Sequence, residues 1–153
     1  MNDIPPPPPR SLNILLAEDN EADIKIALRA FERATLKHTV HVVRDGQEAL
    51  DFLRRQGKHA EAPKPDVVLL DIQMPKLTGL QVLEEMKKDA ALRAIPAVML
   101  TSSRNEGDIR TSYTHSVAGF MQKPIAFEDF EKLVDGFSLY WSSVSCLPKR
   151  TGP

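Results

Sequence analysis

Acidic residues follow two short apolar runs of this 153-residue chain. Glu18 and Asp19 come directly after "NILLA", and Asp71 is the last residue of "VVLLD", so a strand of buried character ends on a carboxylate. Thr101 ends a third apolar run, "PAVMLT", and Lys123 follows a fourth, "GFMQ". The carboxyl ends of parallel strands meet at one edge of an open sheet, so these side chains are predicted to converge there.

Three converging carboxylates repel one another unless a cation lies between them. Oxygen ligands suit Mg²⁺, which keeps several waters and shares its coordination sphere with a phosphate. An aspartate can act as a nucleophile and form an acyl phosphate. Its phosphoryl oxygens would then be compensated by the metal, by Lys123, and by Thr101 with nearby backbone N–H groups. The arrangement predicts phosphoryl transfer with Asp71 as nucleophile and Glu18 and Asp19 as metal ligands.

Each of these residues alone has a simpler interpretation. A single aspartate or threonine at a strand end is more often a helix cap or a turn residue. The prediction depends on their joint placement at four strand ends. The histidines lack zinc-like spacing and are interpreted as solvent-exposed or packing residues: His38, His41, His59 and His115. The single cysteine, Cys146, excludes an internal disulfide and indicates a reducing compartment.

Composition is typical of one ordinary globular domain, with 42% hydrophobic and 27% charged residues. The net charge of -1 gives no bulk attraction to nucleic acid or to an anionic membrane. No apolar run approaches the roughly 18 residues that a membrane span needs, and the N-terminus lacks a signal-peptide pattern. We therefore expect a cytoplasmic protein with neither nucleic acid nor membrane as a partner.

The chain reads as five strand–helix repeats. Strands are predicted at 13–17, 39–43, 67–71, 96–101 and 119–122, and helices at 20–35, 47–56, 78–89, 105–116 and from about 127 to about 143. In the first helix, apolar residues at helical spacing predict a buried face formed by Ile24, Ala27, Leu28 and Phe31. Strict alternation of strands and helices predicts an α/β fold with a five-stranded parallel sheet, right-handed crossovers and helices on both faces.

The ends of the chain are set apart by composition. Residues 1–10 include five consecutive prolines and are predicted to be a disordered leader. A polyproline II ligand for a proline-binding groove is the alternative. The folded domain is predicted to span residues 11–143, followed by a C-terminal tail at 144–153.

Four ordered motifs resemble the receiver domain of two-component response regulators. They are "LLAEDN", "VVLLDIQMPKLTG", "VMLTS" and "QKP", and their order and spacing match the family from about Leu12 to about Val134. The resemblance implies a flavodoxin-like (CheY-like), doubly wound sheet with strand order 2-1-3-4-5. It also implies that Asp71 accepts a phosphoryl group from a histidine kinase.

The resemblance implies a ligand set for Mg²⁺ or Mn²⁺. The Asp19 and Asp71 side chains and the Gln73 carbonyl would hold the ion, with Glu18 as the second acidic residue. Gln73 and Ser103, each two residues beyond a reacting position, would flank the route of the attacking water and tune the phosphate lifetime. Alternatively, both are exposed loop residues without such a role.

The resemblance also implies the parts of a switch. Thr101 and Lys123 would bind phosphoryl oxygens, and Thr101 would move toward the phosphate while the ring of Phe120 turns inward. Phe120 stands where tyrosine is also common, so an output that needs the hydroxyl is not expected. A cis bond before Pro124 would aim Lys123.

The segments "SYTHSVAGFMQKP" and "VDGFSLYWSSVSCLP" resemble the response regulators that partner cyanobacterial and bacterial phytochromes. Those are single-domain proteins that commonly dimerise through the last strand–helix region. Tyr140 and Trp141 are therefore predicted to form a dimer or partner surface, the alternative being that they pack on their own domain. With no second domain expected, the output would be protein binding through the fourth helix, fifth strand and fifth helix.

Two other functions use related chemistry or topology. An Mg²⁺-dependent aspartyl-phosphate phosphatase or mutase usually has a second aspartate two residues after the nucleophile, where this chain has Gln73. A flavin carrier would need a phosphate-binding loop, but "AEDNEAD" is acidic and lacks glycine. We therefore favour a phosphoacceptor switch whose only reactions are its own phosphorylation and slow dephosphorylation. Whether it relays, stores or drains phosphate stays open.

Overall fold

The computed structural model describes residues 11–34, 37–101 and 119–122, and for 101 and 119–122 it describes the backbone alone. The predicted leader at 1–10, the helices at 105–116 and 127–143, and the tail at 144–153 lie outside the described residues. Among the described helices, none has the length and apolar character that crossing a bilayer requires.

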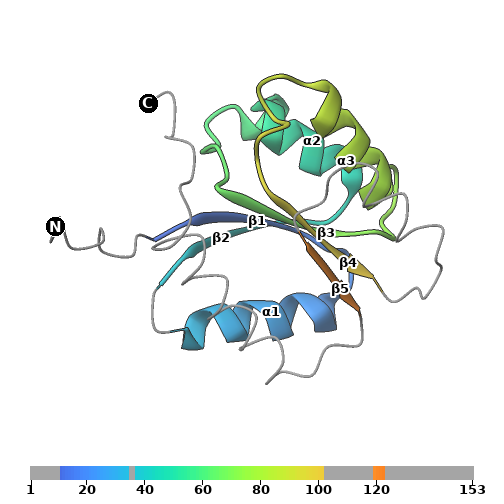
Figure 1. The fold of residues 1–153 in the computed structure, drawn as a ribbon. Coiled ribbons are helices and arrows are strands. Elements are labelled where there is room, and N and C mark those ends of the chain that lie inside the picture. The colour runs from blue at the N-terminus through green and yellow to red at the C-terminus, as the bar shows by residue number, and fades with distance from the viewer. Residues whose placement is uncertain (1–10, 35–36, 102–118, 123–153) are drawn as a thin grey trace, which may run out of the picture.

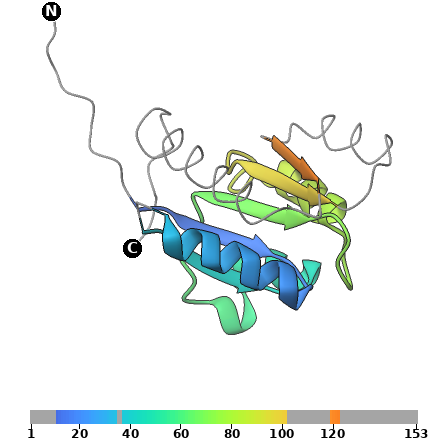
Figure 2. The ribbon, with the colours of Figure 1, turned by 90° about the horizontal axis from the view of Figure 1, so that it is seen from below.

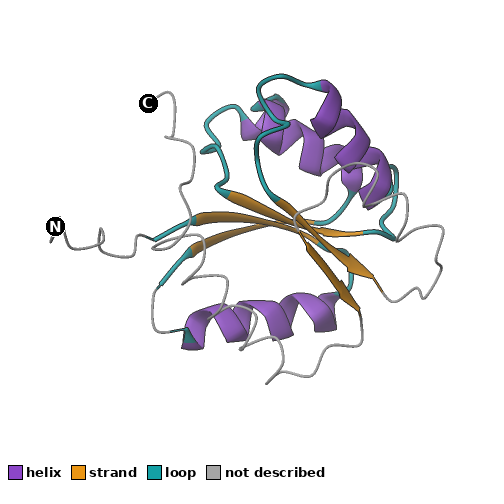
Figure 3. Ribbon diagram, viewed as in Figure 1, coloured by secondary structure: helices purple, strands orange, loops and turns teal. Residues whose placement is uncertain are grey.

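Strands and helices alternate along the described chain, as the sequence predicts (Figure 3). In chain order they are β1 (Asn13–Ala17), α1 (Glu21–Arg33), β2 (Thr39–Val43), α2 (Gly46–Arg54), η1 (Gly57–His59), β3 (Val67–Asp71), α3 (Gly79–Lys88), β4 (Ala97–Thr101) and β5 (Gly119–Gln122). The boundaries differ from the predicted ones by a residue or two, and the short 3₁₀ turn η1 is an addition to the predicted elements.

The strands form one parallel sheet in the order β2-β1-β3-β4-β5. β1 pairs with two neighbouring strands. Its residue Leu16 lies beside Val42 of β2 on one side and beside Leu69 of β3 on the other. On the far side of β3, Asp71 is beside Leu100 of β4. The flavodoxin-like arrangement is thus confirmed for the first four strands, in the order 2-1-3-4. Because these strands are parallel, their carboxyl ends lie at the same edge.

Helices cover both faces of the sheet, with α1 on one face and α2 and α3 on the other (Figures 1 and 2). Successive side chains of a strand point to opposite faces. Ile14 and Leu16 therefore pack in the cluster that contains Phe31 of α1, whereas Leu15 packs in the cluster that contains Leu50 of α2. Burial on both sides explains why β1 and β3 are almost wholly apolar, and it fixes the positions of the polar residues that follow them.

One predicted core position of α1 is wrong. Ile24, Ala27 and Phe31 are buried as predicted, but Leu28 is 38% exposed and Ala30 is buried instead. At about 100° per residue, Leu28 lies at the margin of the buried stripe, on the side away from Ala30. Leu28 therefore has the helical spacing of a core residue, but its side chain does not reach the core.

Side-chain caps set the start of each helix that follows a strand-end loop. Asn20 caps α1 by accepting the backbone N–H of Asp23 at 3.0 Å. Asp45 caps α2 in the same way, and Thr78 and Gln81 form a capping box at α3. These bonds satisfy N–H groups that the first helical turn leaves without an intrahelical partner. The loops at the carboxyl edge are therefore anchored at both ends.

Candidate functional site

Three carboxylates meet at the carboxyl edge of the sheet, as the sequence predicts. Glu18 and Asp19 follow β1, Asp71 ends β3, and β1 and β3 are neighbours. One carboxylate oxygen of each residue lies within 4.8 Å of the other two. Glu18 is 1% exposed and Asp71 is 5% exposed, whereas Asp19 is an exposed residue. The group thus combines two buried acids with one that solvent reaches.

Backbone hydrogen bonds hold Glu18 in place. Its N–H donates to the carbonyl of Val43, the last residue of β2, at 3.0 Å. Its Oε1 accepts the N–H of Asn20 at 3.1 Å, and Asn20 is the cap of α1. The position of this carboxylate is therefore determined by β2 and by the start of α1, both of which pack on the core.

Asp71 is held by the strand that it ends and by the loop that follows. The next residue, Ile72, donates its N–H to the Leu100 carbonyl of β4 at 2.9 Å. The N–H of Gln73 donates to Asp71 Oδ1 at 3.1 Å, and the side chain of Gln73 is exposed. The N–H of Gly79 then donates back to the Ile72 carbonyl at 2.8 Å. The carboxylate therefore has a defined orientation at the base of a closed loop.

The three carboxylates fit a small divalent cation. Carboxylate oxygens are the hard ligands that Mg²⁺ and Mn²⁺ accept. In an octahedral Mg²⁺ site adjacent ligands lie roughly 3 Å apart and opposite ligands roughly 4.2 Å apart, so oxygens that lie within 4.8 Å of one another are close enough to converge on one ion through side-chain rotation. Like charges in such a group are unfavourable without a cation. Among the described residues, the side chains of Glu18, Asp19 and Asp71 could therefore hold the predicted ion.

Two further predicted site residues are placed by their backbone. Thr101 ends β4, one residue after Leu100, which pairs with Asp71. It therefore lies at the same edge of the sheet as the carboxylates. Phe120 lies in β5 beside Met99 of β4. The remaining predicted site residues lie outside the described residues: Ser103, Lys123, Pro124, Tyr140 and Trp141.

The described histidines take part in packing and hydrogen bonding, and the metal-binding group found among the described residues contains none of them. Nδ1 of His38 accepts the N–H of Leu12 at 2.9 Å. Burial lowers the pKa of His38, and the nearby charge of Asp66 opposes that shift.

Burial also lowers the pKa of His41, whose ring packs with its centroid 5.3 Å from that of the Phe52 ring. His59 packs on the same phenylalanine, and His115 lies outside the described residues.

Two glycines that contact the loop after Asp71 were not among the predicted site residues. The N–H of Gly46 donates to the Pro75 carbonyl at 3.3 Å, and Gly79 packs on the backbone of Asp71. In the sequence, the dipeptide Asp45-Gly46 is typical of a turn between a strand and a helix. A glycine directly after a helix cap is the signal that could have indicated close packing, because most other residues form helices better.

Comparison with known proteins gives a consistent result. The chain matches the family model of the response regulator receiver domain over residues 14–135. It is 37% identical over 135 residues to response regulator Rcp1 of Synechocystis sp., covering 88% of this chain and 92% of that protein. It is 41% identical over 129 residues to the probable methanogenesis regulatory protein FilR2 of Methanothrix harundinacea, covering 84% of this chain and 82% of that protein.

Two solved structures resemble this fold over most of its length. The phosphorylated cyanobacterial phytochrome response regulator RcpA superposes with a TM-score of 0.83 at 40% identity, covering 92% of this chain and all of that one (100%). The Mn²⁺-bound form of Rcp1 superposes with a TM-score of 0.81 at 36% identity, covering 90% of this chain and 99% of that one. One of these relatives was solved phosphorylated and the other metal-bound, which are the two states predicted for the three carboxylates.

Proposed function

Because this chain belongs to the response regulator receiver family, whose members signal as phosphoacceptors, we propose that Asp71 is the residue that accepts the phosphoryl group. The observation that carries the proposal is the position of Asp71 at the end of β3, in one group with Glu18 and Asp19. The exposed residues Asp19 and Gln73 lie next to it in the fold, so a donor can approach from the loop side.

In the proposed reaction, a carboxylate oxygen of Asp71 attacks the phosphorus atom of a phosphohistidine on a kinase. A P–O bond forms and the P–N bond breaks, and the departing imidazole nitrogen keeps the electron pair and takes up a proton from solvent. The hydrogen bond from the Gln73 N–H orients the carboxylate, and the buried strand before it limits its motion. Holding the nucleophile in one orientation lowers the entropic cost of the reaction.

We infer that the cation of this site is Mg²⁺ or Mn²⁺. Asp19, Asp71 and the carbonyl of Gln73 would hold it, with Glu18 as the neighbouring acid. When bound, the ion would compensate the negative charge of the phosphoryl group. The fit of the three carboxylates and the Mn²⁺-bound structure of the relative Rcp1 support this inference.

The other site assignments complete the proposal. Thr101 and Lys123 would bind phosphoryl oxygens, and Thr101 with Phe120 would form the switch that reports phosphorylation. Gln73 and Ser103 would set how long the phosphate survives. The backbone position of Thr101 at the end of β4, next to β3, supports its part in this arrangement.

The overall organisation that we propose is a cytoplasmic signalling protein whose only reactions are its own phosphorylation and slow dephosphorylation. Its receiver domain would span residues 11–143 with the complete strand order 2-1-3-4-5, between a leader at 1–10 and a tail at 144–153. A cis bond would precede Pro124. The protein would dimerise through β5 and the last helix, with Tyr140 and Trp141 on the shared or partner-binding surface, and would signal by binding protein, with neither nucleic acid nor membrane as a partner.

The kinase that we propose as the donor is of the phytochrome type. The similarity to RcpA, a cyanobacterial phytochrome response regulator, supports this partner. FilR2 is similar at 41% identity and is named for methanogenesis, so identity alone does not select the kinase. Phosphotransfer from a purified phytochrome kinase should be faster than transfer from a histidine kinase of another signalling class. Equal rates would contradict the partner and leave the role of Asp71 intact.

The role of Asp71 is tested by intact mass after incubation with acetyl phosphate and Mg²⁺. The wild-type protein should gain the mass of one phosphoryl group, in a form that base removes, and Asp71→Asn should gain none. Asp66→Asn is the matched control, since Asp66 is a buried aspartate that directly precedes the other end of β3. Persistence of the added mass in Asp71→Asn would show that the proposal is wrong.

A further inference from the structure

Two glycines occupy positions where the loop after Asp71 leaves no room for a side chain. This loop, residues 72–78, connects β3 to α3 and is here named the acceptor loop. A Cβ added at Gly79 would lie 2.3 Å from the carbonyl oxygen of Asp71, and one added at Gly46 would lie 2.1 Å from the carbonyl oxygen of Leu77. Neither glycine has a positive φ. Space, and not backbone conformation, is therefore what requires glycine at both positions.

Both glycines also donate hydrogen bonds to the acceptor loop. The N–H of Gly79 bonds to the carbonyl of Ile72, the first residue of the loop, at 2.8 Å. The N–H of Gly46 bonds to the carbonyl of Pro75, at the tip, at 3.3 Å. One glycine thus holds the base of the loop against α3, and the other holds its tip against the start of α2.

The tip of the acceptor loop has a strained conformation that needs such support. Lys76 has a φ of 68°, and the N–H of Leu77 donates to the Pro75 carbonyl at 2.8 Å. This is the pattern of a γ-turn with positive φ, which is rare and strained. Such strain persists only where the surroundings hold the chain in place. Nζ of Lys76 also lies 3.5 Å from Oδ2 of Asp45, the cap of α2.

We propose that Gly46 and Gly79 are positioning residues for the phosphoacceptor, and that the start of α2 is the support against which the acceptor loop is fixed. The inference rests on the proposed function of Asp71. The connection runs through Gln73, whose N–H orients Asp71 Oδ1 and whose carbonyl is the proposed metal ligand. An outward shift of the loop tip would move Gln73 and so disturb both the nucleophile and the ion site.

Gly46→Ala is the primary test. Pro75 and Lys76 at the loop tip are exposed, so the added methyl group is expected to displace the loop and leave the core folded. Displacing groups that orient metal ligands typically costs about tenfold to a hundredfold in metal affinity. We expect Mn²⁺ affinity, measured by electron paramagnetic resonance of unbound Mn²⁺, to fall about tenfold. We expect the phosphorylation rate at saturating acetyl phosphate to fall by about the same factor.

Gly57→Ala is the matched control, because Gly57 has a φ of 60° and nothing lies within 4 Å of an added Cβ. The substitution strains the backbone away from the site, so it should lower the urea midpoint and leave Mn²⁺ affinity and phosphorylation within about twofold of wild type. Equal Mn²⁺ affinity and phosphorylation rate in Gly46→Ala and Gly57→Ala would overturn the inference.

Two further outcomes separate this inference from the proposed function. If the wild-type protein is not phosphorylated on Asp71, the proposed function fails, and Mn²⁺ affinity alone then decides whether the glycines position the site.

Gly79→Ala places its methyl group against the buried end of β3, so the folding of this variant is checked first by circular dichroism. If it is folded, it should lose Mn²⁺ affinity as Gly46→Ala does, and an unchanged affinity would contradict the role of Gly79. If it is unfolded, Gly46→Ala alone decides.

Discussion

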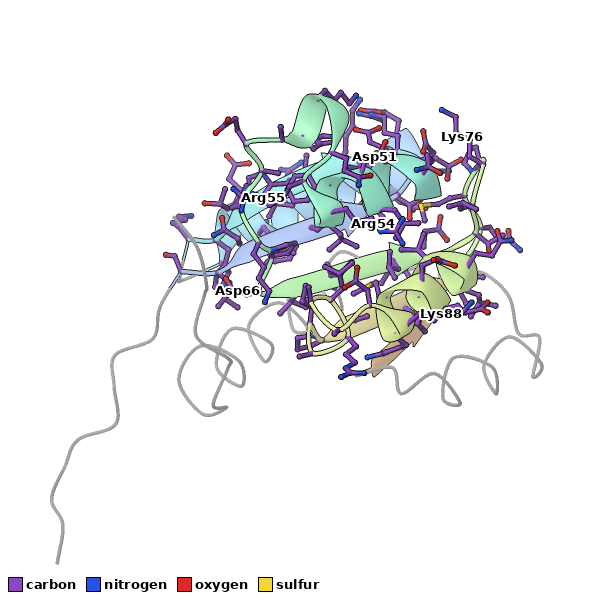
Figure 4. The ribbon with its side chains drawn as sticks, turned by 90° about the horizontal axis from the view of Figure 1, so that it is seen from above. Asp51, Arg54, Arg55, Asp66, Lys76 and Lys88 are labelled. Carbon is purple, nitrogen blue, oxygen red and sulfur yellow. The ribbon has the colours of Figure 1, made fainter. Side chains whose placement is uncertain are left out.

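A buried aspartate flanks β3 at each end. Asp66 precedes the strand and is 8% exposed, and Asp71 ends it and is 5% exposed. Figure 4 shows Asp66 at one end of the strands and Lys76, in the acceptor loop, at the opposite end. The two aspartates flank the same strand and share a residue type and nearly the same burial, so none of these properties explains why one of them is the proposed phosphoacceptor.

The difference lies in the charges that surround each carboxylate. Oδ2 of Asp66 accepts the N–H of Asn13 at 2.8 Å, and the N–H of Asp66 donates to the carbonyl of Asn13 at 2.8 Å, which ties the start of β1 to β3. Asp71 instead shares its surroundings with Glu18 and Asp19. A carboxylate among backbone donors stabilises the fold, whereas one among like charges favours a cation and bound phosphate. We therefore expect Asp71 to contribute less to the stability of the fold than Asp66 does.

Replacing each aspartate by alanine should produce the largest difference in stability between the carboxyl edge of the sheet, where Asp71 lies, and its amino edge, where Asp66 lies. Asp66→Ala removes the acceptor of the partly buried Asn13 N–H and is expected to lower the free energy of unfolding by about 2–3 kcal/mol. Asp71→Ala removes one charge from a repulsive group, so it should change that free energy by less than about 1 kcal/mol. Urea denaturation without divalent cations measures both values. Equal losses at the two positions would show that the edges do not differ in this way.

Addition of Mg²⁺ should stabilise the carboxyl edge and leave the amino edge unaffected. At ten times its dissociation constant, a ligand that binds the folded state alone stabilises it by about 1.4 kcal/mol. Wild type and Asp66→Asn should show this gain as a higher urea midpoint, and Asp19→Asn should lose most of it. A gain of full size in Asp19→Asn would exclude that residue as a metal ligand.

The sequence predicts the carboxyl edge better than the amino edge, for a physical reason. Glu18, Asp19 and Asp71 interrupt apolar runs, and the topology of a parallel sheet brings strand ends together, so a local pattern is enough to identify them. Asp66 follows a proline and precedes its strand, which is typical of a turn residue. Its partner Asn13 is 53 positions away, and a hydrogen bond over that separation leaves no periodic signal.

Packing details were also beyond the sequence, even where the elements were predicted correctly. Helical spacing predicts a face of α1 but does not give its width, so Leu28 was assigned to the core although it lies at the margin. Likewise, Gly46 marks a helix start in the sequence, whereas its contact with Leu77 depends on how two loops meet in space. The order of the first four strands came from the family resemblance, because alternation predicts parallel strands without ordering them.

Acid should weaken the amino edge through His38. Its Nδ1 accepts the Leu12 N–H, so the ring must be neutral at that nitrogen, and burial lowers the pKa of His38 below its ordinary value of 6.5. The folded state therefore binds this proton more weakly than the unfolded state, so stability is complete above pH 6.5 and falls as the pH decreases toward the lowered pKa. Because the ring is half-buried, solvent screening keeps the expected loss below about 1 kcal/mol.

The free energy of unfolding, measured between pH 7.5 and pH 5.5, tests this dependence. His38→Asn keeps an oxygen that can accept the Leu12 N–H and does not titrate, so its stability should depend less steeply on pH than that of wild type. The pKa of His41 is lowered as well, so some dependence should remain in the variant. An unchanged slope in His38→Asn would show that His38 does not cause the acid sensitivity.

The smallest expected effect compares two residues in the left-handed backbone region, one toward each edge (Figure 4). Arg55 has a φ of 57° at the end of α2, and Lys76 has a φ of 68° in the acceptor loop. Glycine relieves the strain at each position but makes the unfolded chain more disordered, so each substitution should raise the free energy of unfolding by only about 0.5 kcal/mol.

The effects of the two substitutions on phosphorylation should differ, because glycine in place of Lys76 lets the acceptor loop leave the position that orients Asp71. Arg55→Gly should therefore keep the wild-type rate with acetyl phosphate, while Lys76→Gly should be slower despite its higher urea midpoint. If Lys76→Gly instead gains stability and keeps its rate, the strain at the loop tip has no part in holding the phosphoacceptor, and the contacts of Gly46 and Gly79 alone would have to do so.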